Sequence, residues 1–124
     1  MKKKQQFKSI RAFIGANNFE ESRKFYKDLE FLEVVLSENM SYFKVDEKLG
    51  FYLQKAYVKD WVDNSMLFLE VEDLEDYLEK LKAKNLQNKY SKVRLSKIVV
   101  NDWGKEFFLH DPSGILWHFG YFNY

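Results

Sequence analysis

The chain has no cysteine, and it has only one proline and five glycines among its 124 residues. Without cysteine there is no disulfide framework, no thiol nucleophile and no thiolate metal site. The sequence also lacks an apolar run long enough to span a membrane, and its start lacks the apolar core of a signal peptide. We therefore expect a cytoplasmic protein without a membrane partner.

Charge of either sign is not in excess, because 20 Lys and Arg stand against 19 Asp and Glu. A nucleic-acid-binding protein would show a basic stripe with exposed aromatic residues, and no such stripe is present. The sequence also contains no Ser-His-Asp order, no glycine-rich phosphate loop and no histidine pair at metal-binding spacing. We expect no nucleic-acid partner.

The chain is rich in apolar residues, at 46%, and in aromatic residues, at 19%. These amounts suffice for a folded core, and the aromatic residues are numerous enough to line a pocket as well. We interpret residues 1–124 as a single domain.

The same order of elements occurs twice along the chain: one strand, one helix and then three strands. In the first half, Asn18 and Glu21 form a capping box, and apolar residues recur at helical spacing to about Asp28. In the second half, a helix is expected over 73–84 and a loop over 85–90. The eight expected strands are 9–15, 31–36, 41–45, 50–54, 66–71, 93–100, 106–110 and 115–121.

The two expected helix starts, Asn18 and Asp73, are 55 residues apart in the sequence. The pattern predicts two βαβββ modules, about 8–56 and about 65–122. The strand at 66–71 places Met66, Phe68 and Glu70 on one face and apolar residues on the other. An aromatic and polar face opposite a helix-facing one favours an α+β fold in which a curved mixed sheet encloses a cleft.

Residues 103–119 are typical of a β-hairpin. Asp111-Pro112-Ser113-Gly114 suits a type I turn, because Asp favours its first position and Pro presets φ at the second. His118 follows on the second strand, between Trp117 and Phe119. His118 is therefore an ionisable group among aromatic residues, and in a pocket it could serve as a hydrogen-bond partner or as an acid or base.

Two motifs resemble the vicinal oxygen chelate superfamily, which includes glyoxalase I, extradiol dioxygenases and bleomycin-resistance proteins. Residues 18–26, NFEESRKFY, are similar to the first helix signature of that family, and WGKEF at 103–107 with DPSG at 111–114 is similar to a segment typical of its bleomycin-resistance branch. The resemblance covers about residues 8–122. It implies the glyoxalase/bleomycin-resistance fold.

In the metal-using members, four strand positions hold a divalent ion, usually through two His and two Glu. Matching by motif places Arg11, Tyr52 (or Gln54), Met66 and His118 at these positions. Only His118 suits an ion that prefers nitrogen and oxygen ligands. We therefore expect no bound metal and no cofactor, and the lyase and dioxygenase activities of the family are the alternative interpretation.

The ligand site is expected in the cup of the sheet, where the aromatic residues offer stacking area with few polar anchors. The expected site residues are Arg11, Tyr52, Trp61, Phe68, Trp103, Phe108 and His118. Arg11 is expected to be buried and to need an anionic partner, either a ligand or an internal Glu70 or Glu106. Its charge favours a planar ligand with an anionic group.

The preferred hypothesis is a metal-free protein that binds or sequesters an aromatic or planar small molecule in the cleft of a homodimer. No catalytic residue is assigned. Three alternatives stay open: a metal-dependent lyase or dioxygenase, a metal-free enzyme with His118 as acid or base, and a stable module without a small-molecule role.

Overall fold

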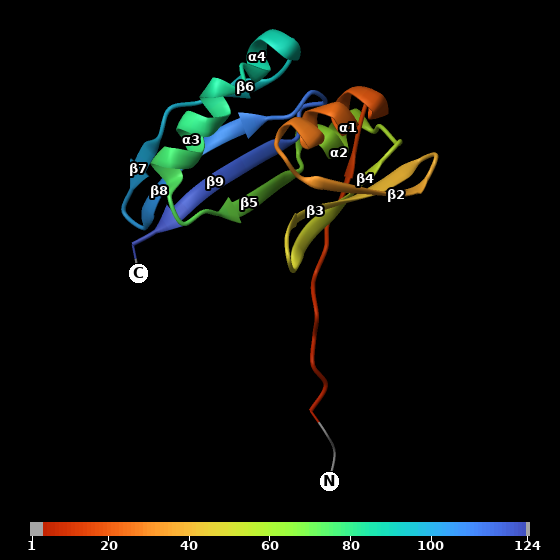
Figure 1. Ribbon diagram of the computed structural model, residues 1–124, viewed down its shortest axis with the longest axis horizontal. Helices are drawn as coiled ribbons and strands as arrows, with labels where there is room; N and C mark the ends of the chain where they lie inside the picture. The colour runs from red at the N-terminus through yellow and green to blue at the C-terminus, as the bar shows by residue number, and fades with distance from the viewer. Residues whose placement is uncertain (1–3, 124) are drawn as a thin grey trace.

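The two expected modules form two separate sheets in the computed structural model, which describes residues 4–123 (Figure 1). The first module comprises β1 (Phe13–Gly15), α1 (Phe19–Asp28), β2 (Leu32–Ser37), β3 (Met40–Asp46) and β4 (Leu49–Gln54). The short helix α2 (Lys59–Asp63) leads to the second module. That module comprises β5 (Met66–Glu70), α3 (Leu74–Ala83), α4 (Leu86–Lys89), β6 (Arg94–Leu95), β7 (Val99–Asn101), β8 (Gly104–His110) and β9 (Leu116–Phe122).

The internal repeat is visible in the strand order, which is β1-β4-β3-β2 in one sheet and β5-β9-β8-β6 in the other, with β7 also paired to β8. In each sheet the first strand of the module runs parallel to the last, and the other pairs are antiparallel. Phe13 of β1 lies opposite Tyr52, and Phe68 of β5 lies opposite His118. These two pairs therefore occupy equivalent positions in the two modules.

The helices begin at the capping residues that the sequence predicts. The Asn18 side chain accepts a hydrogen bond from the Glu21 amide at 3.1 Å, and the Asp73 side chain accepts one from the Asp76 amide at 3.0 Å. Each bond satisfies one of the free amides of a first helical turn. The predicted α1 and α3 are thus confirmed to within a residue.

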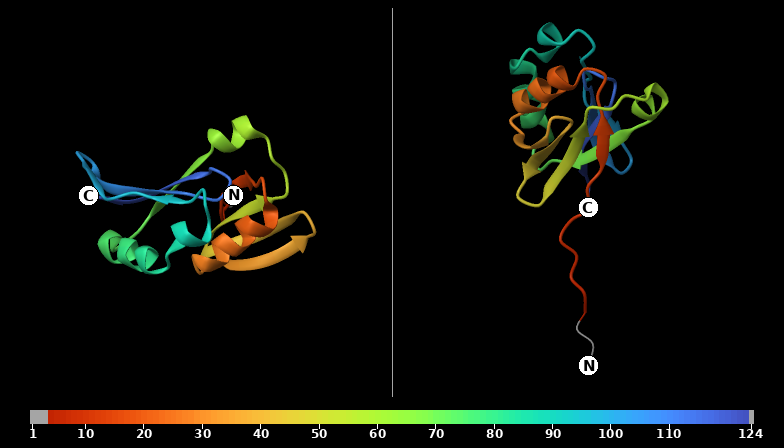
Figure 2. Two further views of the ribbon diagram at one scale, coloured as in Figure 1. Left: turned by 90° about the horizontal axis from the view of Figure 1, so that it is seen from above. Right: turned by 90° about the vertical axis from the view of Figure 1, so that its right-hand side faces the viewer.

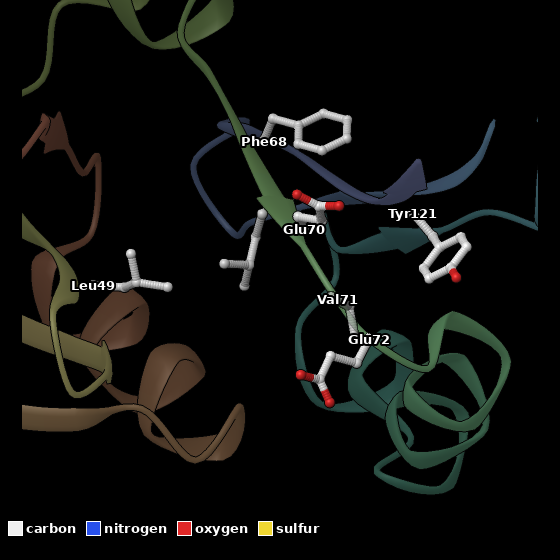
Figure 3. Close-up of a pocket in the computed structure, with 7 residues that line it drawn as sticks. Leu49, Phe68, Glu70, Val71, Glu72 and Tyr121 are labelled. Atoms are coloured by element: carbon white, nitrogen blue, oxygen red, sulfur yellow. The ribbon is translucent and has the colours of Figure 1, made fainter. Parts of the chain in front are cut away.

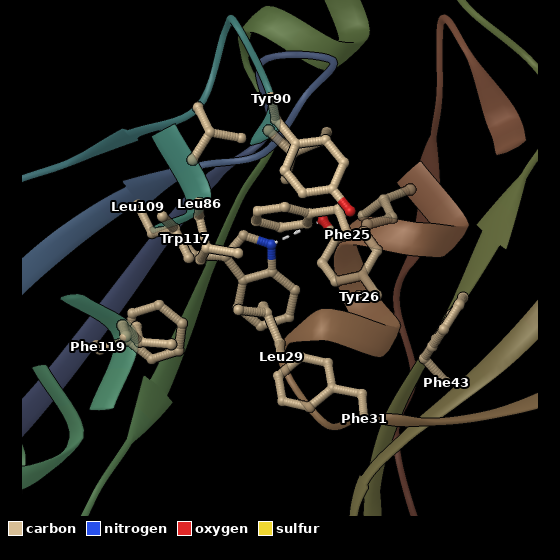
Figure 4. Close-up of a cluster of buried hydrophobic side chains, with 14 of the residues drawn as sticks. Phe25, Tyr26, Leu29, Phe31, Phe43, Leu86, Tyr90, Leu109, Trp117 and Phe119 are labelled. Carbon is tan, nitrogen blue, oxygen red and sulfur yellow. Dashed lines mark hydrogen bonds between the residues drawn. The ribbon is translucent and has the colours of Figure 1, made fainter. Parts of the chain in front are cut away.

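The main helices, α1 and α3, lie on one side of the sheets, and α2 lies on the other (Figure 2). Side chains that face α1 and α3 are buried, such as Phe51 of β4 and Phe107 and Trp117 of the second sheet. The Trp117 ring packs 5.9 Å from Tyr26 and 5.2 Å from Phe51 between ring centroids, so one aromatic cluster joins the modules (Figure 4).

The predicted hairpin turn between β8 and β9 is confirmed. The Gly114 amide donates to the Asp111 carbonyl, and Oδ1 of the Asp111 carboxylate accepts from the amides of Ser113, Gly114 and Ile115. Gly114 has φ of 108°, a backbone conformation that glycine adopts readily and that residues with a Cβ rarely adopt. The turn therefore fixes the start of the strand that carries His118.

Apart from shifts of one or two residues at strand ends, the elements differ from the expectation in four places. The strand at 9–15 begins only at Phe13, because the chain joins β4 at Ala12 and the described residues before it make no strand pairing. The strand at 93–100 is split into β6 and β7, which makes nine strands in the described part of the chain. The loop at 85–90 contains α4, and α2 was not expected. None of the helices between residues 4 and 123 is long and apolar enough to cross a membrane.

The split between β6 and β7 has a local cause at Ser96. Its hydroxyl accepts a hydrogen bond from the Phe108 amide at 2.8 Å and donates one to the Lys97 carbonyl at 2.9 Å. A side chain thus takes the place of a strand-to-strand backbone bond. Hydroxyl groups that bond nearby backbone compete with regular structure in this way.

Candidate ligand-binding site

The side of the second sheet that faces away from α3 carries aromatic and polar side chains, and we call it the open face. It results from strand alternation, since Leu67, Phe107 and Trp117 point toward the helices while their neighbours point away. The residues of the open face are Met66, Phe68 and Glu70 of β5, Glu106 and Phe108 of β8, and His118 and Phe122 of β9. The face expected for Phe68 and Glu70 is therefore confirmed.

An aromatic cluster covers part of the open face. The Phe68 ring lies 5.9 Å from Trp103 and 5.4 Å from Phe122 between centroids, and Trp103 lies 5.0 Å from Phe122. Phe68 and Trp103 nevertheless stay partly exposed to solvent. Aromatic side chains on an open sheet face can stack on a planar ligand.

Gly120 makes room for this cluster. A Cβ at this position would lie 2.3 Å from Cζ of Phe68, closer than real side-chain carbons approach. The absence of a side chain therefore allows the Phe68 ring to lie against β9.

A polar network lies beside the aromatic cluster. Nδ1 of His118 lies 2.9 Å from one oxygen of the Glu106 carboxylate, and the Asn101 amide donates to the other oxygen at 3.0 Å. Nε2 of His118 lies 3.2 Å from the sulfur of Met66. The His118 and Glu106 side chains are 20% and 13% exposed, so the pair is shielded but not sealed from solvent. Glu106 fixes the imidazole while Nε2 stays directed toward the open face.

A hollow of about 500 Å³ borders the cluster and extends toward the first module (Figure 3). Its lining residues are Leu49, Phe68, Leu69, Glu70, Val71, Glu72 and Tyr121. The volume is within the range of small-molecule sites. The side chains of Glu70 and Glu72 give this hollow negative charge.

Arg11 and Tyr52 lie on the first module, away from the aromatic cluster. Arg11 is exposed, Nη1 donates to the Tyr52 hydroxyl at 2.9 Å, and the guanidinium lies 4.3 Å from the Tyr42 ring centroid. Phe13 stacks on Tyr52 at 4.6 Å. The expectation that Arg11 is buried and pairs with Glu70 or Glu106 was wrong, because β1 begins after Arg11 and Glu106 is engaged by His118.

Trp61 lies at a third place, on α2, where it is 73% exposed and borders a hollow of about 90 Å³ with Phe13 and Gln54. Within one chain, the structure therefore brings together four of the seven expected residues: Phe68, Trp103, Phe108 and His118. An anionic ligand at this cluster would not meet Arg11 of the same chain.

The residues at the family's metal positions do not fit its divalent ion. Arg11 is cationic and Met66 offers a soft thioether, so Nε2 of His118 is a suitable nitrogen donor without suitable partners at these two positions. Across residues 4–123, no group of three or more His, Cys, Asp or Glu side chains is arranged to hold a metal ion.

Sequence reasoning did not assign Glu106, Asn101, Phe122 and Gly120 to the site. Strand alternation could have assigned Glu106 to the site, because Glu106 and Phe108 are two residues apart and share a face of β8. The Asn101 contact depends on the tight β7–β8 connection and is not visible in a sequence pattern.

Comparison with solved structures identifies the fold. The bleomycin-binding protein of bleomycin-producing Streptomyces verticillus, complexed with copper(II)-bleomycin, superposes with a TM-score of 0.80 at 16% identity, covering 95% of this chain and 98% of that one. A bleomycin resistance determinant encoded on transposon Tn5 has a TM-score of 0.74 at 18% identity, with 94% and 99% covered. A glyoxalase/bleomycin resistance protein from Catenulispora acidiphila has 0.71 at 18%, with 91% and 96% covered.

No protein-family model and no curated protein sequence matches the chain. At these identities the likeness concerns the fold, and it confirms the α+β glyoxalase/bleomycin-resistance fold that the two motifs implied.

Proposed function

We propose that this chain, which has the glyoxalase/bleomycin-resistance fold, is a metal-free protein that binds or sequesters an aromatic or planar small molecule on the open face of its second sheet. The observation that carries the proposal is the cluster of Phe68, Trp103 and Phe122, which gathers aromatic rings on a partly exposed surface. Contiguous exposed apolar patches are typical of ligand-binding grooves and interaction sites.

The make-up of the site favours binding by stacking. The rings supply apolar area, while His118 and Glu70 supply a few polar groups that fix orientation, which is the usual composition of a small-molecule pocket. Two of the solved structures with this fold hold bleomycin or copper(II)-bleomycin. They support a sequestering role as a proposal for this chain.

We propose further that the protein is a homodimer in which the N-terminal arm, residues 4–12, packs beside the second module of the partner. Before Arg11 and Ala12, which bond to Tyr52, the arm runs away from the body of its own chain (Figure 1), and its Phe7 and Ile10 are 91% and 98% exposed. The edge strands β1 and β5 also carry exposed apolar side chains, Phe13 and Met66. Pairing of two copies would cover these surfaces.

A dimer would also explain the dispersed site residues. Arg11, Tyr52 and Trp61 lie close to the N-terminal arm or β1, so they would enter a cleft completed by the partner's second module. In the proposal they line that cleft together with Phe68, Trp103, Phe108 and His118 of the other protomer.

The alternative is a metal-dependent lyase or dioxygenase, and elemental analysis distinguishes it from the proposal. Protein purified without chelators should contain well under one equivalent of Zn, Ni, Fe or Mn, because Arg11 and Met66 are poor ligands for these ions. A stoichiometric ion coordinated by His118 would favour the alternative.

The proposal is tested by a thermal-shift screen with aromatic, cationic and anionic compounds. A ligand that binds only the folded state raises the melting temperature, and the stabilisation grows with the logarithm of the ratio of free ligand concentration to Kd. We expect stabilisation by planar aromatic compounds. If none of the three classes stabilises the protein, a module without a small-molecule role is the better account.

A further inference from the structure

The position of Glu106 determines which nitrogen of His118 carries hydrogen. An ionised carboxylate only accepts hydrogen bonds, and Glu106 accepts from Asn101 at one oxygen while its other oxygen lies 2.9 Å from Nδ1 of His118. Nδ1 must therefore donate to Glu106. In a neutral imidazole the other nitrogen, Nε2, is then a hydrogen-bond acceptor.

The surroundings of Nε2 leave this acceptor available to a ligand. Its neighbour is the thioether sulfur of Met66 at 3.2 Å, which can only accept a hydrogen bond. With hydrogen on Nδ1 of His118, this contact joins two acceptors and is held by no hydrogen bond, and Met66 is a flexible residue that is 64% exposed, so a ligand donor can displace it. The Phe68 ring is stacked 6.1 Å from the imidazole, and the Phe108 ring meets it edge-on at 5.0 Å. A polar acceptor thus lies at the border of an aromatic surface.

We propose that the site selects planar aromatic ligands that carry an O–H or N–H donor on the ring, and that this donor binds Nε2 of His118 in place of the Met66 sulfur. Glu106 and Asn101 are positioning residues, since they act on the ligand only by fixing the imidazole. This inference rests on the proposed function, and it adds the chemical class of the ligand. It does not depend on the anionic group that Arg11 was expected to bind.

The first test is the tautomer of the neutral His118 imidazole, measured by nitrogen-15 NMR at pH 8. We expect hydrogen on Nδ1 in the wild-type protein. In Glu106→Gln a carboxamide can donate as well as accept, so the preference for Nδ1–H should weaken or reverse. An Nε2–H tautomer in the wild type would overturn the inference without any ligand being present.

The second test compares two probes of nearly equal shape, 2-naphthol and 2-methoxynaphthalene, of which only the first has a donor. At pH 8 we expect 2-naphthol to bind up to about tenfold more tightly, as one net hydrogen bond allows. In His118→Phe the two affinities should become equal. Trp103→Ala should weaken both probes while their ratio persists, and Glu106→Gln should reduce the ratio in a variant of nearly unchanged size.

The outcomes separate the inference from the function on which it rests. Equal wild-type binding of both probes would overturn the donor requirement and leave the aromatic site intact. A ratio that persists in folded His118→Phe would show that the ligand donor binds an acceptor on another residue, and it would overturn the role of His118. Binding of neither probe would contradict the proposed aromatic site, and the inference with it.

Discussion

The hydroxyl of Tyr26 in α1 donates a hydrogen bond of 2.6 Å to Oδ2 of Asp111 in the β8–β9 turn, and it accepts one of 2.9 Å from Nε1 of Trp117. Burial raises the pKa of Tyr26, which keeps the phenol proton that is donated to Asp111, and burial also raises the pKa of Asp111 against the hydrogen bonds that lower it. These three residues connect the first helix motif with the hairpin motif, which are the two segments that carry the family resemblance.

Tyr26→Phe should destabilise the fold by about 1–3 kcal/mol, because it removes a buried hydroxyl and leaves Oδ2 of Asp111 and Nε1 of Trp117 without that partner. Urea unfolding monitored by circular dichroism measures the change. Tyr57→Phe is the matched control, since Tyr57 is 40% exposed, and it should change stability little. Equal stability of Tyr26→Phe and wild type would show that the network does not hold the modules together.

Glu33 makes part of the stability dependent on pH. Burial alone would raise its pKa, but hydrogen bonds from Arg23 and Ser41 outweigh burial, and the pKa lies below its ordinary value. A lowered pKa in the folded state adds stability above about pH 4.3, the ordinary pKa of Glu, and that stability is lost as the pH falls through the lower, folded pKa.

Glu33→Gln should therefore cost about 1–3 kcal/mol at pH 7. Its difference from wild type should shrink as acid protonates Glu33 in the parent protein. Urea unfolding at pH 7 and pH 3 measures both values, with the exposed Glu38→Gln as control. A difference that stays constant between the two pH values would refute the assigned role of the carboxylate.

Gly120→Ala should displace the Phe68 ring and alter the environment of Trp103, which contacts that ring. The cost in stability should be small because Phe68 is partly exposed and its ring can move. The indole N–H signal of Trp103 in a proton–nitrogen NMR spectrum reports the change. Gly50→Ala creates the corresponding clash with the Tyr42 ring on the other sheet, and it should leave the Trp103 signal unmoved.

The proposed dimer should be visible by light scattering at tens of micromolar protein, a concentration at which even weak dimers form. Replacing both Phe7 and Ile10 by Ser should shift the mass to that of one chain, because these exposed side chains are the apolar contacts that the arm can offer. A wild-type protein that is monomeric at this concentration would rule out the dimer cleft.

The fold could be predicted from the sequence wherever an element depends on contacts between residues close together in the chain. Asn18 and Asp73 cap their helices through contacts three residues away, and Asp111 bonds amides within its own turn, so short segments carried the information. Strand alternation likewise predicted which face Phe68 occupies.

The site was harder to predict because its contacts are long-range. Arg11 was placed in a buried strand because the residues around it are apolar, but burial there depends on a neighbour that the extended arm lacks. The pairing of His118 with Glu106 depends on the register of β8 and β9, and the Asn101 contact depends on a split strand. Only a three-dimensional arrangement shows that Phe68, Trp103 and His118 meet, while Trp61 borders a separate hollow beside Phe13 of β1.

The central claim is that the open face binds a planar aromatic ligand, and the affinity of Trp103→Ala for a ligand found in the screen tests it most directly. Loss of an aromatic contact worth about 0.5–1.5 kcal/mol beyond area burial should weaken binding by about tenfold. Arg11→Ala measures the contribution of the first module in the same titration, and Val100→Ala, which removes an exposed apolar side chain of β7, should have no effect. If Trp103→Ala and Arg11→Ala both fold normally and bind the ligand as tightly as wild type, the site is elsewhere.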